Sequence, residues 1–308
     1  MRISVVLFIL LLMQKFSFAQ QSGQPVIDVH LHALSSDWLG GWNTVMWNYL
    51  QLPTPESEEH LMMQSLELMK KYNVVKAITS GSLVSKWKEK EPGIIVRCTN
   101  PSLLNQSDDY WEQVRQKYHN NEFEVFGEIG IQYTGYSPDD KLFQKFFRLA
   151  EELEIPIGIH MGLGPPGAAY ECCPEYRMHL SNPLLLEEVL IRYPKLRIYV
   201  MHAGWPMLDE MVGLLYAHPQ VYVDVAVINW YIPTEEFHTY LKRLVSAGFG
   251  KRIMYGSDQM IWPEAIRLSI EGIESAEFLS TEQKRDIFYN NAARFFRLSD
   301  EQIQQHHK

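Results

Sequence analysis

Short apolar runs rich in β-branched residues alternate with longer amphipathic stretches along the chain. Eight apolar runs follow one another: Val26–Val29, Val74–Ile78, Ile94–Val96, Glu124–Ile129, Ile155–Ile159, Leu196–Met201, Val221–Val225 and Arg252–Tyr255. The stretches between them show helical spacing of apolar residues, for example Glu58–Lys71, Asp108–His119, Asp139–Leu153, Pro183–Tyr193 and Thr234–Ala247. Nearly continuous apolar strands separated by helices are typical of a parallel sheet that is covered on both faces.

Eight strand–helix units in a chain of 308 residues predict an α/β fold, a (β/α)8 TIM barrel. We expect one domain, residues 20–308. A doubly wound open sheet is the alternative, but no glycine-rich fingerprint follows the first run, where dinucleotide-binding sheets carry theirs.

The first nineteen residues have the pattern of a secretory signal peptide. Arg2 precedes an apolar stretch, Ile3–Met13, and small residues occupy the positions before a cut after Ala19. The apolar stretch is too short to span a bilayer, so we expect no stable membrane anchor. The sequence therefore predicts a periplasmic or secreted protein.

Composition adds limits on partners and cofactors. The hydrophobic fraction is 46%, and the net charge of -9 argues against binding nucleic acid through its phosphates. Three cysteines, Cys98, Cys172 and Cys173, form no disulfide framework and lack zinc-thiolate spacing. We expect unpaired thiols, with a disulfide between Cys98 and one of the other two as the alternative that the sequence leaves open. We also expect the polar tail from Gln302 to Lys308 to be frayed. The sequence leaves open whether the chain forms a homo-oligomer.

Histidines and carboxylates stand where predicted strands end. His30 and His32 close the first run, and residues two apart on a strand point to the same face. Further residues of this kind end the fourth, fifth, sixth and eighth runs: Glu128, His160, His202 and Asp258. Taken singly, each has an ordinary structural explanation. In a barrel, however, these ends surround one mouth.

Six such side chains in one mouth would be costly to desolvate without a cation. Converging imidazoles and carboxylates are ligands for a divalent metal ion. The sequence therefore predicts a metal site at the carboxyl ends of the strands.

In this order of strands, the set resembles the amidohydrolase superfamily of metal-dependent hydrolases. The chain is most similar to the amidohydrolase-related branch that includes aminocarboxymuconate-semialdehyde decarboxylase. The ending Asn291-Ala292-Ala293-Arg294 is similar to the closing helix of that branch. The resemblance covers the whole chain after the signal peptide.

The resemblance implies that His30, His32, His160 and Asp258 bind a divalent metal, zinc above all, and that His202 is a catalytic imidazole. Glu128 is either a ligand that bridges two metal ions or an acceptor that orients a histidine. The resemblance therefore leaves open whether one ion or two are bound.

Metal-assisted hydrolysis needs a water with a lowered pKa and a base that takes its proton. Asp258 is our candidate for this base, and His202 for stabilising the oxyanion or protonating the leaving group. Residues after the strands are our candidates for binding a small-molecule substrate: Trp42, Arg97, Trp205 and Trp262. Each of these has a structural alternative, packing for the tryptophans and a salt bridge for Arg97.

The leading functional hypothesis is an exported metal-dependent hydrolase that cleaves a C–O or C–N bond of an ester, lactone or amide. The second is a non-oxidative decarboxylase of an aromatic or unsaturated acid, because the similar branch includes such enzymes. A nuclease is disfavoured by the acidic charge. A non-catalytic metal-binding or sugar-binding barrel is disfavoured because every ligand-type position and the candidate base are present.

Overall fold

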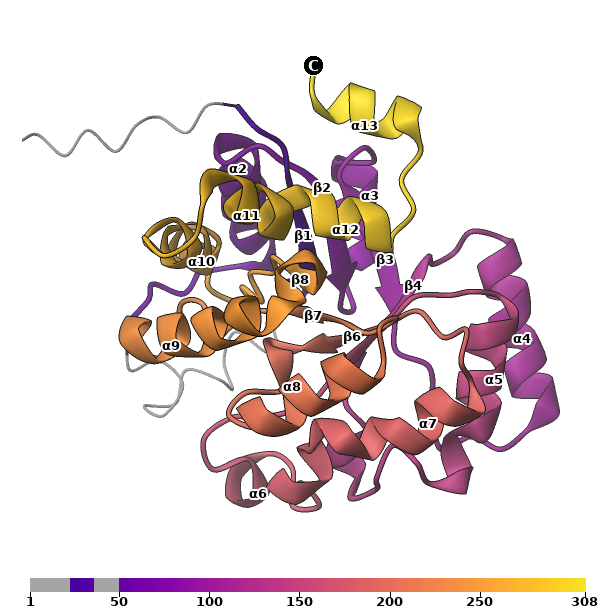
Figure 1. Cartoon of the computed structure of the whole chain (residues 1–308). Helices are drawn as coiled ribbons and strands as arrows, with labels where there is room; N and C mark the ends of the chain where they lie inside the picture. Colours follow the sequence, from indigo (N-terminus) through magenta and orange to yellow (C-terminus); the bar gives the residue numbers. More distant parts are fainter. Residues whose placement is uncertain (1–22, 36–49) are drawn as a thin grey trace, which may run out of the picture.

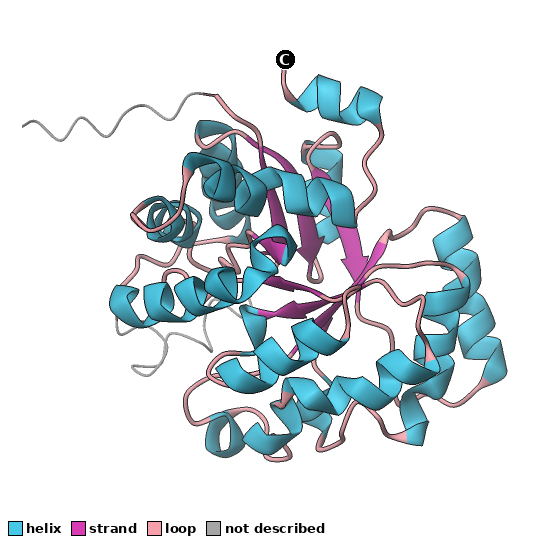
Figure 2. Ribbon diagram, in the orientation of Figure 1, coloured by secondary structure: helices cyan, strands magenta, loops and turns pink. Residues whose placement is uncertain are grey.

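The computed structural model describes residues 23–35 and 50–308 of the chain, so the predicted signal peptide lies outside the described residues. Eight strands form one parallel sheet in the order β1 to β8. Helices surround this sheet (Figures 1 and 2). The strands are β1 (Val26–His32), β2 (Val74–Ser80), β3 (Ile95–Thr99), β4 (Val125–Ile129), β5 (Ile157–His160), β6 (Ile198–Met201), β7 (Tyr222–Asp224) and β8 (Ile253–Met254).

Backbone hydrogen bonds between the first strand and the segment after the last one close the sheet into a barrel. The Val29 amide donates to the Tyr255 carbonyl at 3.0 Å, and the Asp258 amide donates to the His30 carbonyl at 2.7 Å. The predicted (β/α)8 barrel is confirmed, and each of the eight predicted runs contains or overlaps an observed strand.

The described helices are α2 (Glu58–Lys71), α3 (Val84–Lys90), α4 (Asp108–His119), α5 (Gln144–Glu152), α6 (Ala168–Glu171), α7 (Glu187–Arg192), α8 (Leu208–Ala217), α9 (Thr234–Leu244), α10 (Glu264–Glu274), α11 (Thr281–Arg285), α12 (Asn291–Phe295) and α13 (Asp300–His306). Helices α2 and α4 have the predicted bounds because Ser57 and Ser107 cap their first turns. Helix α5 begins later than predicted, since Asp140 caps a separate 3-10 turn ahead of it.

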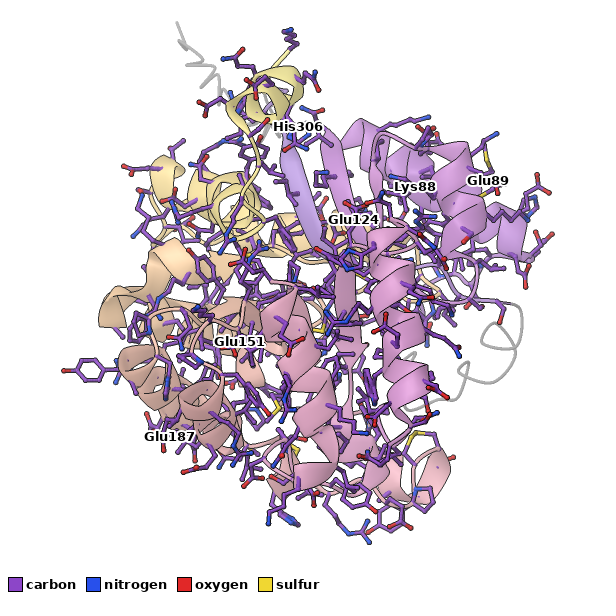
Figure 3. The ribbon with its side chains drawn as sticks, turned by 90° about the vertical axis from the view of Figure 1, so that its right-hand side faces the viewer. Lys88, Glu89, Glu124, Glu151, Glu187 and His306 are labelled. Atoms are coloured by element: carbon purple, nitrogen blue, oxygen red, sulfur yellow. A yellow bond between two sulfur atoms is a disulfide. The ribbon has the colours of Figure 1, made fainter. Side chains whose placement is uncertain are left out.

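The outer core lies between the strands and these helices. Phe126 on β4 contacts Phe146 on α5 with ring centres 5.1 Å apart, and Phe146 in turn contacts Trp111 on α4 at 6.2 Å. Exposed acidic residues are spread over the outer surface, such as Glu89 on α3 and Glu187 on α7 (Figure 3). None of the helices in the described part of the chain is long and apolar enough to cross a membrane.

The C-terminal segment packs against the end of the barrel from which the strands start, where α13 lies in Figure 1. Phe295 and Phe296 pack on Tyr199, whose hydroxyl donates to the Val29 carbonyl at 3.0 Å inside the barrel. The frayed tail that we expected is wrong. Ser299 forms a capping box at the start of α13, and Tyr289 hydrogen-bonds His306 at 2.9 Å.

Candidate metal centre

The structure brings together all six predicted residues at the carboxyl ends of the strands. His30 and His32 end β1, Glu128 lies in β4, His160 ends β5, His202 follows β6, and Asp258 follows β8. The imidazoles and Asp258 are buried, and only Glu128 is partly exposed.

One group of ligand atoms forms around β1. The Nε2 atom of His32 lies 2.9 Å from Oδ1 of Asp258, and the Nε2 atom of His30 lies 3.8 Å from the same oxygen. The Oε2 atom of Glu128 lies 3.7 Å from His30 Nε2 and 3.6 Å from His32 Nε2. Atoms at such separations can share one cation.

A second group forms around the other oxygen of Glu128. Its Oε1 atom contacts Nδ1 of His160 and lies 3.5 Å from Nε2 of His202. The two imidazole nitrogens are 3.3 Å apart. Glu128 therefore belongs to both groups, one through each oxygen, and the geometry offers two neighbouring positions for a cation.

Each imidazole is held by its other nitrogen, so that the nitrogen facing the centre is fixed in direction. Asp224 lies 3.2 Å from Nδ1 of His30, and the Ser80 hydroxyl lies 2.8 Å from Nδ1 of His32. For the other two rings the partners are backbone carbonyls, at 2.5 Å for His160 Nε2 and 3.0 Å for His202 Nδ1. Such outer contacts set the tautomer that leaves a lone pair for a metal.

The donor atoms themselves fit a cation. Among the described residues, His30 Nε2 is buried and has no hydrogen-bond partner, and the buried Asp258 Oδ1 faces the imidazole nitrogens of His30 and His32. Burial would raise the pKa of the Glu128 carboxyl, but His160, His202 and His30 hold this pKa well below its usual range. Burial also opposes ionisation of Asp258, whose pKa is lowered by His30 and His32. Both carboxyl groups are therefore charged acceptors for a divalent ion.

Two buried aspartates that were not predicted from the sequence support this centre. Oδ1 of Asp224, at the end of β7, also accepts from the His202 amide at 2.9 Å. Asp28 accepts from the amides of His30 and Ser257, each at 3.0 Å, and its burial raises its pKa to about 6. Asp224 carries the signal used for the other strand ends, a carboxylate after an apolar run, and that signal could have found it.

The centre opens into a cavity of about 390 Å³. Its polar lining, besides the ligand-type residues, includes Ser80, Asn100 and Tyr133. Tyr133 lies in a 3-10 turn after β4, and its hydroxyl is 3.4 Å from His160 Nε2. The apolar lining comprises Leu34, Leu163, Pro165, Val227 and Met260 together with Cys172 and Cys173. No lysine or arginine is among the described residues that line the cavity.

Three of the four predicted substrate-binding residues do not line this cavity, and Trp42 lies outside the described residues. Trp262 is 1% exposed and packs on Trp230, while Trp205 donates to Glu236 at 3.1 Å. The prediction for Trp205 and Trp262 is wrong because both rings pack into the covering layer.

The prediction for Arg97 is also wrong. Strand β3 runs to Thr99, three residues beyond its predicted end, so Arg97 lies within the strand. Its neighbours Val96 and Cys98 belong to the interior of the barrel, which places Arg97 on the outer face. There it donates to the Asn121 carbonyl.

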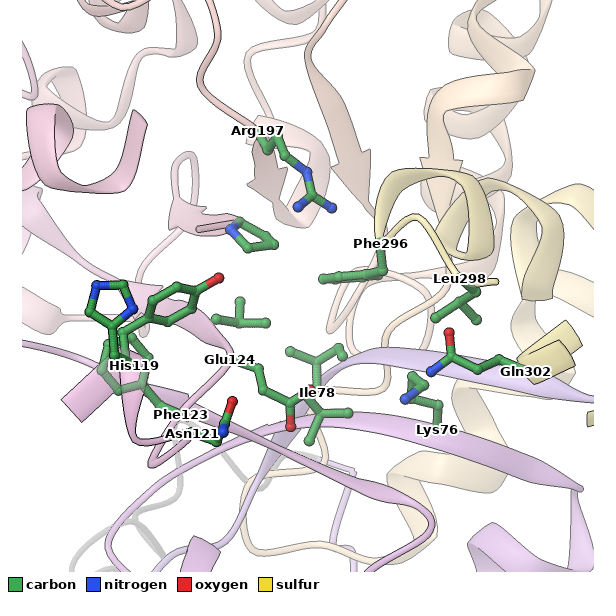
Figure 4. Close-up of a pocket in the computed structure, with 14 residues that line it drawn as sticks. Lys76, Ile78, His119, Asn121, Phe123, Glu124, Arg197, Phe296, Leu298 and Gln302 are labelled. Carbon is green, nitrogen blue, oxygen red and sulfur yellow. The ribbon is translucent and has the colours of Figure 1, made fainter. Parts of the chain in front are cut away.

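A second cavity, of about 370 Å³, lies at the amino ends of the strands (Figure 4). Lys76, Glu124 and Arg197 are its charged residues, and none of the six candidate ligands lines it. The Arg197 guanidinium donates to the carbonyls of Glu154 and Phe295. This cavity therefore lacks the convergent acceptors that characterise the mouth of the barrel.

The family model of the amidohydrolases matches residues 27–298, which is nearly the whole described chain. The chain belongs to the amidohydrolase family. Together with the ligand geometry, this makes it a metal-dependent enzyme. The predicted amidohydrolase-related branch is thereby confirmed.

Two curated relatives match shorter segments. A stretch of 102 residues is 34% identical to an uncharacterized metal-dependent hydrolase of Methanocaldococcus jannaschii, covering 32% of this chain and 33% of that protein. A stretch of 161 residues is 19% identical to the protein fluG of Emericella nidulans, covering 47% of this chain and 18% of that protein. The matches thus span a third or less of the length of these relatives.

Solved structures show the same fold over most of the chain. An uncharacterized TIM-barrel protein from Bordetella bronchiseptica superposes with a TM-score of 0.66 at 15% identity, covering 92% of this chain and 100% of that chain. A 5-carboxyvanillate decarboxylase from Novosphingobium aromaticivorans, complexed with manganese, gives 0.62 at 15%, covering 90% and 97%. A probable 2-pyrone-4,6-dicarboxylic acid hydrolase from Acinetobacter baumannii gives 0.62 at 13%, covering 89% and 100%. At these identities the likeness shows the fold alone.

Proposed function

We propose that this enzyme hydrolyses a C–O or C–N bond of a neutral small molecule, such as an ester, a lactone or an amide. The observation that carries the proposal is the lining of the cavity. Acidic and imidazole groups converge at the strand ends, the other walls are largely apolar, and no described lining residue is a lysine or arginine. Residues 36–49 contain no lysine or arginine either.

This lining supports a neutral substrate over an aromatic acid. A substrate carboxylate needs a cationic partner when it is desolvated. No lysine or arginine among the described lining residues offers such a partner, so the metal ion would be the only cation that the described part of the cavity presents to it. A neutral carbonyl compound needs no further cationic partner.

His30, His32, Asp258 and Glu128 are the residues that would hold the essential divalent ion, which we propose to be zinc. Imidazole nitrogens and carboxylate oxygens are a donor set that zinc accepts, although a related fold carries manganese. When bound, such an ion lowers the pKa of a water towards neutrality and polarises a carbonyl. His160 and His202 face the other oxygen of Glu128 and offer a place for a second ion.

Asp258 and His202 carry the proton chemistry in this proposal. Asp258 has one buried oxygen directed at the imidazoles of β1, and its carboxylate is the base that accepts the proton of the attacking water. His202 lines the cavity with Nε2 facing inward. In its protonated form it delivers the Nε2 proton to the leaving group, and the proton that Asp258 takes from the water then replaces it. In a two-ion enzyme His202 is a ligand instead, so metal analysis of the purified protein tests its role.

We also propose that the protein is exported. The pattern of residues 1–19 supports this, and so does the disulfide between Cys172 and Cys173, since disulfides persist in oxidising compartments. The expectation of three unpaired thiols was wrong: the adjacent cysteines are joined, and Cys98 is the free and buried one.

One screen tests the reaction. The zinc-loaded enzyme is incubated with aryl esters, lactones and anilides, and separately with hydroxylated benzoic acids. Titration of released acid detects hydrolysis, and detection of carbon dioxide reports decarboxylation. We expect hydrolysis of a neutral compound with incorporation of oxygen from labelled water. Carbon dioxide release from a benzoic acid, without hydrolysis of any neutral compound, would overturn the proposal in favour of a decarboxylase.

A further inference from the structure

The loop that follows β5 contributes two bonded sulfur atoms to the cavity at the candidate metal centre. Cys172 and Cys173 are adjacent in sequence and form a disulfide, and both residues line the cavity, Cys172 exposed and Cys173 half-buried. A disulfide between neighbouring residues closes a small ring that includes their shared peptide bond. Such a ring cannot tie distant parts of the fold together, so its effect is confined to this wall of the cavity.

The backbone around the ring is anchored on both sides. The Cys173 amide donates to the Ala168 carbonyl at 2.8 Å, and the Cys173 carbonyl accepts from the Tyr176 amide at 2.8 Å. At the start of the loop, the Leu163 amide donates to the Trp205 carbonyl at 2.7 Å. The sulfur atoms are therefore presented from a loop with defined hydrogen bonds.

The ring lies close to the ligand-type residues through a short chain of contacts. The backbone amide of Tyr176 donates a hydrogen bond to the Cys173 carbonyl, and the ring of Tyr176 packs on that of Tyr133 with centres 5.1 Å apart. The Tyr133 hydroxyl is 3.4 Å from Nε2 of His160. A substrate group that touches the disulfide can therefore belong to the same small molecule as the bond at the metal centre, in a cavity of about 390 Å³.

Much of the cavity that the disulfide lines is apolar. Leu34, Leu163, Pro165 and Met260 belong to the same lining. Two free thiols would add S–H donors and a site for oxidation, whereas a disulfide has no donor and is polarisable. Polarisable sulfur makes favourable contacts with aromatic rings.

We propose that the Cys172–Cys173 disulfide is a specificity-determining wall of the active site, which receives an aromatic or other cyclic apolar group of the substrate. This inference rests on the proposed function, because it takes the mouth of the barrel as the place of reaction. It narrows the substrate class to esters, lactones or amides that carry such a group beside the scissile carbonyl.

The bond itself is tested first by alkylation. The full-length mature protein is unfolded without reductant and treated with iodoacetamide, and its mass is measured by mass spectrometry. One labelled cysteine, Cys98, is the expected result. Three labelled cysteines in protein purified from an oxidising compartment would overturn the inference.

Binding of two hydroxamates then tests the wall without requiring turnover. Acetohydroxamate and benzohydroxamate chelate zinc through the same group and differ only in a methyl or a phenyl substituent. Calorimetry on the zinc-loaded enzyme should show benzohydroxamate binding at least about tenfold more tightly, from burial of the ring. Equal affinities of the wild-type enzyme for the two compounds would refute the proposed wall.

The variant Cys172→Ser/Cys173→Ser replaces the sulfur wall by two hydroxyl groups. Its preference for benzohydroxamate should fall to about threefold or less, while its affinity for acetohydroxamate and its zinc content stay within about twofold of wild type. Cys98→Ala is the matched control and should keep the full preference, because Cys98 lies in the barrel interior. An undiminished preference in the double variant would overturn the inference.

The outcomes also separate this inference from the proposed function. If acetohydroxamate fails to bind the zinc-loaded wild-type enzyme, the metal centre is wrong and the inference falls with it. If acetohydroxamate binds and the phenyl group adds nothing, the metal centre stands and only the disulfide wall is refuted.

Discussion

The barrel has a cavity at each end, and the two are nearly equal in size, about 390 Å³ at the carboxyl ends of the strands and about 370 Å³ at the amino ends. At the carboxyl ends, buried acceptor atoms converge and one of them, His30 Nε2, has no hydrogen-bond partner among the described residues. At the amino ends, Arg197 donates to two backbone carbonyls, and Lys76 shares the cavity with Glu124 but has no hydrogen bond or ion pair among the described residues.

This difference shows that size does not identify the active site. The guanidinium of Arg197 donates hydrogen bonds to two backbone carbonyls, which gives this side chain a structural role. Each imidazole at the mouth instead makes a hydrogen bond through one ring nitrogen, for example with Asp224 or Ser80. The other ring nitrogens therefore face one another. That arrangement costs free energy unless a cation completes it.

The largest expected effect comes from removing the candidate base. Asp258→Asn keeps the shape of the side chain but cannot accept the proton of the attacking water. We expect kcat/KM to fall by about a thousandfold, within the range seen for loss of a general base. The measurement is the initial rate on a compound found by the screen, with zinc content and the thermal melt recorded alongside. An unchanged kcat/KM would refute the assignment.

Removal of the metal from the centre at the carboxyl ends of the strands should lower the stability of the folded enzyme. A ligand present at a hundred times its dissociation constant stabilises the folded state by about 2.7 kcal/mol. Chelation by dipicolinate should therefore lower the melting temperature of the wild-type enzyme by several degrees and abolish activity, and added zinc should restore both.

A variant that lacks both β1 ligands, His30→Ala/His32→Ala, provides the comparison for this experiment. Its melting temperature should no longer respond to dipicolinate or to zinc. A response equal to that of the wild type would place the stabilising ion elsewhere.

A smaller effect is expected from Asp224, which touches the ring of His30 and not the metal position itself. In Asp224→Asn the amide would donate to Nδ1 of His30, so the ring proton would move to Nε2 and block its lone pair. Loss of such an outer contact weakens metal binding by about 10- to 100-fold. Competition with a zinc indicator measures this affinity.

Asp286→Asn is the matched control. Asp286 is also buried, but it accepts from Lys251 at 2.6 Å in a segment that does not line the mouth. Its zinc affinity should equal that of the wild type. If the two variants lose affinity equally, Asp224 has no special role in orienting His30.

The sequence was sufficient for the barrel and for the position of the six ligand-type residues at its mouth, because each rests on a local pattern. An apolar run gives the strand, and the residue that ends it lies at the mouth by the geometry of the fold. Asp224 obeys the same rule and was overlooked. Tyr133 was out of reach because it sits in a 3-10 turn, and sequence does not show where such a turn directs its side chain.

The substrate-facing residues were the least predictable, for a physical reason. A tryptophan after a strand can line the cavity or pack outward, and Trp262 packs on Trp230. The predicted end of β3 came three residues too early. Arg97 was therefore expected after the strand, whereas it lies within the strand on the outer face of the barrel. The disulfide between Cys172 and Cys173 depends on the local turn of the loop, which the spacing of cysteines does not reveal.

The smallest effect is expected at the other end of the barrel, from Lys76. Its side chain has no hydrogen bond or ion pair with the described residues. Burial lowers its pKa from the ordinary 10.5, against the opposite effect of the Glu124 carboxylate. Lys76→Met should leave kcat/KM within about twofold of wild type and raise the free energy of unfolding by about 0.5 kcal/mol at neutral pH. The unfolded chain holds this proton more tightly than the folded one, so wild-type stability rises with pH between the lowered pKa and 10.5. The increase in the free energy of unfolding that Lys76→Met gives should therefore shrink when urea denaturation is repeated at higher pH. A large loss of activity in this variant would show that the two ends of the barrel are functionally coupled.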